Sequence, residues 1–229
     1  MRTLSLCSND FIDDDGSVHG VFTFRPEFER DISDRCILSL FDVSGEWSRP
    51  YREAGYPVAH IDILNEHCPC DVWDINGMEW LDDNGLCDVW GILAAVPCTD
   101  FAASGARWFA AKDADGSTDA SVALARHTLA IIEFLRPAWW VIENPVGRLP
   151  SLVPDLKEFG PWYFQPCDFG DPYTKKTGLW GEFNRNLKRT PVPPTEGSKI
   201  HRMPPSEDRQ YLRSITPAGF ARAFFEANP

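Results

Sequence analysis

Two polar residues at the ends of apolar runs are the best candidates for chemistry in this sequence. Cys98 stands in VPCTDF, just after the apolar run VWGILAAV, and Glu143 stands near the end of AWWVIENP. A thiolate can attack a substrate, although a cysteine by itself is more often a small buried side chain. A carboxyl group at a neighbouring strand end would favour the catalytic interpretation of Cys98, so the elements that position these residues must be considered next.

Short apolar runs alternate along the chain with segments of helical periodicity, which predicts strands and helices in turn. The helix that closes the chain carries Pro217 in its first turn, and the long central helix stops before Pro137. Strands are expected at residues 36–43, 56–63, 88–96 and 138–145, helices within 44–55, 118–136 and 216–228, and a short strand and a helix within 65–85.

This alternation predicts an α/β fold of the doubly wound class, with a mostly parallel sheet covered by helices on both faces. In such sheets, ligands bind beyond the carboxyl ends of the strands. Four segments of the sequence are expected at these ends and therefore converge on one crevice: residues 42–45, Asp62, residues 97–101 and residues 143–145.

The 229 residues, of which 43% are hydrophobic, suit one catalytic domain over 1–229 with an N-terminal extension at 1–35 and an irregular, proline-rich segment at about 185–212. Seven cysteines without regular spacing indicate reduced thiols. No apolar run is long enough to span a bilayer and no secretory signal is evident, so we expect a cytoplasmic protein without a membrane partner. The HCPC cluster at 67–70 lacks a second pair of ligands, so no metal is expected.

The net charge of −12 argues against a general nucleic-acid binder, but the charge is unevenly distributed. Residues 170–213 contain nine Lys and Arg against five acidic residues. A surface that faces phosphate is therefore expected in the C-terminal quarter of the chain.

The segment FDVSGEW places Gly45 in a turn after the first predicted strand, where backbone N–H groups can approach a ligand. Asp62 ends the second strand, where an acid can accept the hydroxyls of a ribose. The GxGxxG pattern of NAD and FAD proteins is absent. Alternatively, Gly45 forms an ordinary tight turn and Asp62 is a surface acid.

Four blocks in order resemble the DNA cytosine-5 methyltransferases, specifically a compact, phage-type branch without a full target-recognition domain. They are LFDVSGEWSRPYREAGYPVAHIDI, VPCTDFAASGARWF, VIENPVGRL and FGDPYTKKTGLWG, and they span roughly residues 37 to 181. The resemblance implies a Rossmann-like fold, S-adenosylmethionine as cofactor and DNA as partner, with the target base turned out of the helix. Single-stranded DNA, RNA or a free cytidine nucleotide remain alternative substrates.

The resemblance also implies roles for individual residues. Cys98 would add to carbon 6 of cytosine, and Glu143 would hold or protonate N3. Trp108 and Phe109 could touch a base, although core packing is the expectation for both. The implied catalytic residues are Cys98, Glu143, Asn144, Lys175 and Lys176; the cofactor-binding residues are Phe41, Asp42, Ser44, Gly45, Asp62, Ile63, Asp74, Ile75 and Pro97; the substrate-binding residues are Pro145, Arg107 and Arg148.

The chain departs from the family pattern at several points. The usual PPC and ENV are VPC and ENP here, and the Gly-Asn block near the C-terminus is not evident. Lys175 or Lys176 would have to serve where the family has an arginine that contacts the ring oxygen and the cysteine, and a lysine lacks the guanidinium fork. The recognition region is reduced to about 30 residues, which leaves little room to read bases in a groove. A third hypothesis is therefore that the protein is a catalytically silent relative that binds cofactor or nucleic acid.

Overall fold

The computed structural model describes residues 10–12, 18–20, 31–64, 70–75, 89–206 and 208–229, which form two compact units, Met1–Asp31 and Ile32–Pro229. In the first unit, β1 (Asp10–Ile12) pairs with β2 (Val18–Gly20) in antiparallel fashion. All residues discussed below belong to the second unit.

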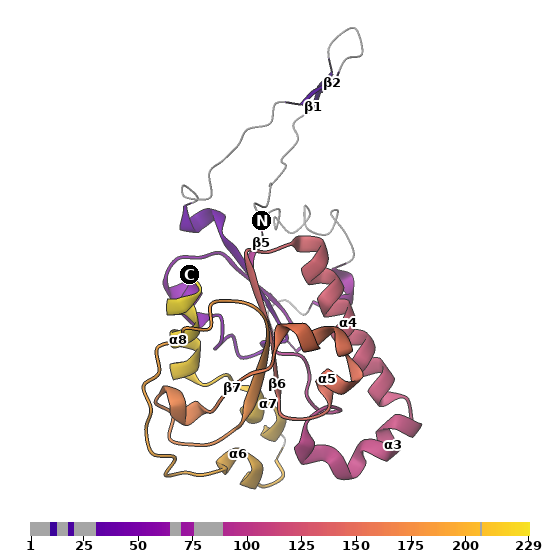
Figure 1. Cartoon of the computed structure of the whole chain (residues 1–229), viewed down its shortest axis with the longest axis vertical. Helices are drawn as coiled ribbons and strands as arrows, with labels where there is room; N and C mark the ends of the chain where they lie inside the picture. The colour runs from indigo at the N-terminus through magenta and orange to yellow at the C-terminus, as the bar shows by residue number, and fades with distance from the viewer. Residues whose placement is uncertain (1–9, 13–17, 21–30, 65–69, 76–88, 207) are drawn as a thin grey trace. The chain divides into compact units, whose positions relative to one another are not determined.

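A six-stranded sheet forms the centre of the second unit (Figure 1). Four strands run parallel, in the order β4, β3, β5, β6, and the sheet continues with β8, antiparallel to β6, and β7, antiparallel to β8. Their bounds are β3 (Cys36–Leu40), β4 (Val58–Ile61), β5 (Val89–Ala94), β6 (Trp139–Pro145), β7 (Trp162–Phe164) and β8 (Thr177–Glu182).

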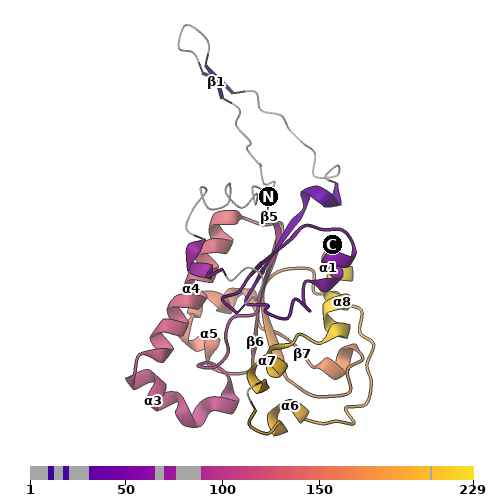
Figure 2. The ribbon, with the colours of Figure 1, turned by 180° about the vertical axis from the view of Figure 1, so that it is seen from behind.

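Both faces of the sheet are buried because successive side chains of a strand point to opposite faces. Leu38, Ile92 and Ile142 lie in one apolar cluster, while their neighbours Ile37, Leu93 and Val141 lie in the other. Residues of α4 (Ser117–Leu135) belong to the first cluster and residues of α8 (Ala218–Ala227) to the second, and Figures 1 and 2 show these helices on opposite sides of the sheet. The arrangement is a Rossmann-like α/β fold, with a mostly parallel sheet between two layers of helices.

Shorter helices complete the unit. Of those that cover the sheet, α1 (Arg49–Glu53) follows β3 and α5 (Leu149–Leu152) follows β6. No helix in the described part of the chain is both long and apolar enough to cross a membrane. The remaining helical segments are η1 (Ile32–Asp34), η2 (Val72–Asp74), η3 (Ala103–Trp108), α3 (Phe109–Ala114), η4 (Pro154–Phe159), η5 (Pro166–Phe169), α6 (Lys199–Arg202) and α7 (Arg209–Ser214).

The four strands, the central helix and the C-terminal helix predicted from the sequence are confirmed, with ends shifted by a few residues. The strand and helix expected within 65–85 lie mostly outside the described residues; the described part holds η2. The antiparallel strands β7 and β8 were not predicted. The segment expected to be irregular at 185–212 contains α6 and the start of α7, which bring it back toward the sheet.

Candidate active site

The carboxyl ends of β5 and β6 lie side by side and carry Cys98 and Glu143. The two strands pair in parallel up to Ala94 and Ile142, so the residues that follow emerge at the same edge. Asn144 is fully buried, and its Nδ2 donates a hydrogen bond to the carbonyl oxygen of Val96 at 2.8 Å. Asn144 thus fixes the backbone two residues before Cys98, through a hydrogen bond that is buried inside the protein.

Lysine 175 reaches the same edge because β8 runs antiparallel to β6. Pro145 is the register partner of Thr177, so the residues before Thr177 lie beyond the end of β6. The Nζ of Lys175 lies 3.8 Å from Oε1 of Glu143. Lys176 is exposed instead, with its Nζ 4.7 Å from the ring centroid of Tyr163, so the fold brings only one of the two candidate lysines to the acid.

Burial and charge control the protonation of this cluster. Burial raises the pKa of Glu143, and Lys175 and Thr177 oppose the rise. Burial also raises the pKa of the Cys98 thiol, and the negative charge of Glu143 raises it further. The positive charges of Lys175 and Arg213 act in the opposite direction. The thiol is therefore the resting form of Cys98, and its activation depends on nearby cations.

The loop after Cys98 is held in place by its own backbone and by an acid. The carbonyl oxygen of Cys98 accepts hydrogen bonds from the backbone N–H groups of Phe101 and Ala102, at 3.1 and 2.9 Å. Asp100 is buried, and its carboxylate accepts a hydrogen bond from Ser121 Oγ at 2.6 Å and pairs with Lys112 Nζ at 2.7 Å. Both contacts tie the loop to the helices that follow it.

A second set of contacts joins this loop to the loop after β6. The N–H of Ala103 donates to the carbonyl oxygen of Val146, and the N–H of Arg148 donates to that of Phe101, both at 2.9 Å. A Cβ on Gly147 would lie 1.9 Å from the carbonyl oxygen of Phe101, so only glycine fits where the two loops cross. The segments that carry Cys98 and Glu143 are therefore one connected unit.

The two arginines expected to bind substrate differ in their surroundings. The guanidinium of Arg148 bonds to both carboxylate oxygens of Asp113, to Thr118 Oγ1 and to the carbonyl oxygen of Asp100, all at 2.8–2.9 Å, and lies over the Phe109 ring. These contacts join α3, the start of α4 and the loop after β5 to the loop that carries Arg148.

Arg107, by contrast, is exposed and lies 5.0 Å from the ring centroid of Trp108. Trp108 is 55% exposed, so the core role expected for it is wrong, because η3 places its ring outside the apolar cluster. Pro145 is half-buried and Pro97 is exposed at the same edge.

Asp42 organises the turn after β3. Its carboxylate accepts hydrogen bonds from the hydroxyls of Ser39, Ser44 and Ser48 at 3.1–3.2 Å and from the Ser48 N–H at 3.3 Å. Asp42 is almost fully buried, so it shapes the loop that a cofactor would contact. Phe41 and Gly45 adopt left-handed backbone conformations, with φ of 60° and 64°, which make the turn tight.

Asp62 lies half-buried at the end of β4. Its Oδ1 accepts a hydrogen bond from the Leu64 N–H at 2.8 Å, and burial raises its pKa, with a smaller contribution from Asp42. Ile63 beside it is 62% exposed, although it is apolar. Asp74 is exposed and its carboxylate accepts a hydrogen bond from the Asp71 N–H at the start of η2, whereas Ile75 is buried in the core.

Two residues that were not predicted from the sequence are brought to the cluster by the C-terminal segment. The carbonyl oxygen of Arg213, in α7, accepts a hydrogen bond from Lys175 Nζ at 3.2 Å. His201 lies in α6, and its pKa is lowered by burial and by the charges of Arg213 and Lys175. The excess of basic residues in 170–213 was the only signal in the sequence. Figure 2 shows α6 and α7 at the same end of the sheet as α3.

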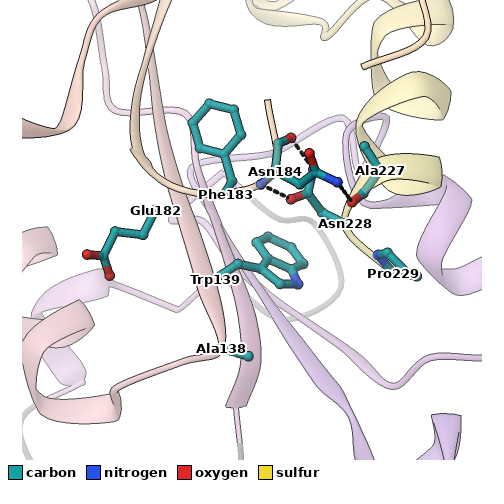
Figure 3. A pocket seen from close by; sticks show the side chains of 8 residues that line it. All are labelled: Ala138, Trp139, Glu182, Phe183, Asn184, Ala227, Asn228 and Pro229. Atoms are coloured by element: carbon teal, nitrogen blue, oxygen red, sulfur yellow. Dashed lines mark hydrogen bonds between the residues drawn. The ribbon is translucent and has the colours of Figure 1, made fainter. Parts of the chain in front are cut away.

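A hollow of about 520 Å³ lies at the other end of β6 (Figure 3). Trp139, the first residue of β6, and Glu182, the last residue of β8, line it together with residues near the C-terminus. It is thus remote from the carboxyl ends of the strands. Within the described residues, no three His, Cys, Asp or Glu side chains gather as metal ligands would.

The chain is a Rossmann-like α/β protein, and its similarity to known proteins is a similarity of fold alone. No family model matches the chain, and no curated protein matches it. Among solved structures, it is similar to a candidate DNA modification methyltransferase encoded within a prophage of E. coli, with 18% identity, a TM-score of 0.46 and 65% of this chain covered. It is also similar to the methyltransferase EhMeth of Entamoeba histolytica, with 13% identity, a TM-score of 0.43 and 67% covered. The chain spans 46% and 55% of the lengths of these two proteins.

Proposed function

We propose that this protein transfers a methyl group from S-adenosylmethionine to carbon 5 of cytosine in DNA, through covalent addition of Cys98 to carbon 6. The observation that carries the proposal is the cluster of Cys98, Glu143 and Lys175 where β5, β6 and β8 meet. A thiol, a buried carboxyl group and an ammonium group are the three kinds of group that nucleophilic addition to a pyrimidine requires.

The neighbouring strand ends fit the cofactor. The tight turn at Phe41 and Gly45 follows β3 at this edge of the sheet, Asp62 can accept ribose hydroxyls, and the exposed Ile63 offers an apolar surface to an adenine ring. When bound there, S-adenosylmethionine would supply the electrophilic methyl group. Asp42 would support the turn, because its carboxylate is engaged by four donors within the protein.

The protein side chains then have defined tasks. The Cys98 thiolate forms a bond to carbon 6, and the electron pair of the 5,6 double bond becomes available at carbon 5. Glu143 in its protonated form donates to N3 and so limits the negative charge on the ring, consistent with its raised pKa. After carbon 5 has been methylated, its proton leaves to a base, the double bond reforms and Cys98 departs as the thiolate.

The experiment is transfer of a labelled methyl group to DNA, followed by mass spectrometry of the nucleosides. Wild-type protein should produce 5-methylcytosine, and Cys98→Ser should produce none. Cys167→Ser provides a matched control, because Cys167 is another half-buried free thiol, positioned in η5. A 5-fluorocytosine oligonucleotide should become covalently attached to the peptide that contains Cys98. Methylation that persists in Cys98→Ser would refute the proposal.

A free cytidine nucleotide or RNA is the second candidate substrate, favoured by the compact C-terminal segment. Its backbone bonds directly to the residues before β8: Thr174 N donates to the Gly197 oxygen, and Glu196 N donates to the Pro172 oxygen, both at 2.8 Å. The segment therefore packs against the site. Methylation of dCMP, dCTP or RNA in preference to DNA would support this candidate, and methylation of DNA alone would exclude it.

A further inference from the structure

The charges of Glu143 and Lys175 largely offset each other at the thiol. Glu143 is 15% and Lys175 is 12% exposed, and their charged atoms lie 3.8 Å apart. Seen from Cys98, an ionised pair of this kind is a dipole rather than a net positive charge. Formation of a thiolate at the half-buried Cys98 is therefore favoured by a further cation.

Arg213 is placed to supply that cation. Its carbonyl oxygen is bonded to Lys175 Nζ, so α7 lies directly against the cluster. The residue is half-buried, and its guanidinium has no hydrogen bond or ion pair with any residue that the structure describes. A guanidinium remains charged at every relevant pH, and a half-buried one without a partner favours a nearby anion.

We propose that Arg213 is a positioning residue that stabilises the thiolate of Cys98, so that the docking of α7 against Lys175 prepares the nucleophile. This inference rests on the role of Cys98 in the proposed function, but it concerns the state of the thiol and not the identity of the substrate. It gives the compact C-terminal segment a part in activation as well as in substrate contact.

Electrostatics within the cluster agree with this assignment. Arg213 and Lys175 lower the pKa of the Cys98 thiol, against burial and Glu143, which raise it. His201 also faces this cluster from α6, and its lowered pKa leaves it uncharged at neutral pH. The charged groups that act on the thiol are therefore Glu143 in its ionised form, Lys175 and Arg213.

The test is the pH dependence of Cys98 alkylation by iodoacetamide, measured on the full chain by mass spectrometry of the Cys98 peptide. Arg213→Gln should move the midpoint to higher pH by about half to one unit, so that alkylation below the midpoint slows roughly three- to tenfold. Arg213→Lys keeps the charge and should stay close to wild type. The plateau at high pH reports access to the thiol separately from its ionisation.

Arg209→Gln is the matched control, since it removes one positive charge one turn earlier in α7. Its midpoint should remain at the wild-type value. A profile of Arg213→Gln that superimposes on wild type would overturn the inference, as would an equal shift in Arg209→Gln. Because no methyl transfer is involved, a shifted profile in a protein that methylates nothing would retain the inference while refuting the proposed function.

Discussion

Lys175 and Glu143 face each other across two antiparallel strands, with 3.8 Å between Nζ and Oε1. The contact depends on register: Glu143 lies two residues before the end of β6, and Lys175 lies two residues before the start of β8. The antiparallel direction of β8 brings together a lysine and an acid that are 32 positions apart in the sequence. The two partners have opposite effects on the pKa of the Cys98 thiol: Glu143 raises it and Lys175 lowers it.

Glu143→Gln should have opposite effects on thiol reactivity and on methyl transfer. Loss of the carboxylate removes a negative charge that raises the pKa of the Cys98 thiol, so that pKa falls and alkylation begins at lower pH. Methyl transfer should nevertheless fall by about 100-fold or more, because the amide cannot donate the proton that N3 requires. Alkylation profiles and initial rates of labelled transfer measure the two effects.

Glu182→Gln is the control for this substitution, since Glu182 is exposed at the far end of β8. Glu182→Gln should change neither the alkylation profile of Cys98 nor the rate of methyl transfer. Lys175→Gln should move the alkylation midpoint in the other direction, to higher pH. Parallel changes of thiol reactivity and transfer in Glu143→Gln would contradict the assigned role.

Substitution of Asp42 and of Asp62 should have different effects, because Asp42 is expected to support the fold and Asp62 to bind the cofactor. Asp42→Asn loses charged hydrogen bonds in a buried network and should lower the free energy of unfolding by about 1 to 3 kcal/mol in urea denaturation. Asp62→Asn should leave stability nearly unchanged and weaken S-adenosylmethionine about tenfold to a hundredfold in calorimetry.

The pH dependence of cofactor affinity provides an independent check. The ribose hydroxyls would donate to the carboxylate of Asp62, whose pKa is raised chiefly by burial. Affinity should therefore be full at neutral pH and should fall as the pH drops through that raised pKa. Asp62→Asn should abolish this pH dependence. An unchanged pH dependence in Asp62→Asn would mean that the ribose binds elsewhere.

Gly147 should tolerate no side chain, because a Cβ there would lie 1.9 Å from the Phe101 carbonyl oxygen. Gly147→Ala is expected to lower the free energy of unfolding by about 1 to 3 kcal/mol and to displace the loop that carries Cys98. Gly105→Ala is the control, since its Cβ would meet nothing nearer than the Thr99 oxygen at 3.6 Å. Equal stability of the two variants would show that the loops can separate freely.

The parallel half of the sheet could be predicted because its strands are continuous apolar runs followed by polar residues, such as Cys36–Leu40 before the Asp42 turn. The antiparallel half could not. β7 is only three residues long, and β8 contains two glycines, Gly178 and Gly181, so neither has the periodicity of a strand. Gly181 avoids a clash with the Trp140 carbonyl oxygen, a requirement that only the folded sheet reveals.

The residues of the candidate site also differ in whether their positions could be predicted from the sequence. Cys98 and Glu143 could be predicted because each lies close to the carboxyl end of an apolar strand. Arg213 could not, because its position depends on how α7 returns to Lys175, and no spacing in the sequence encodes that contact. Asp42 was assigned to cofactor contact by the resemblance to the methyltransferases; the serines that engage its carboxylate are common residues without a distinctive pattern.

Arg148 should behave as a structural residue rather than as a contact for substrate. Arg148→Lys cannot reproduce the paired hydrogen bonds to Asp113 together with those to Thr118 and the Asp100 oxygen. We expect a lower Tm and faster amide exchange in η3 and α3. The comparison is Arg107→Lys, which changes an exposed arginine and should leave both quantities unaltered. A raised KM for DNA in Arg148→Lys with unchanged Tm and exchange would instead assign Arg148 to the substrate.

Trp108 should contribute to nucleic-acid binding without contributing to stability. Its ring is 55% exposed in η3, with the Arg107 guanidinium beside it, and an exposed aromatic residue next to a cation can stack on an unpaired base. Trp108→Ala should weaken binding of a single-stranded, cytosine-containing oligonucleotide by roughly 5- to 100-fold in fluorescence anisotropy. Phe134→Ala is the control, because Phe134 is 49% exposed near the C-terminal end of α4. Equal binding by Trp108→Ala and wild type would mean that the base enters without stacking on η3, and the polar groups at the ends of β5 and β6 would then have to hold it alone.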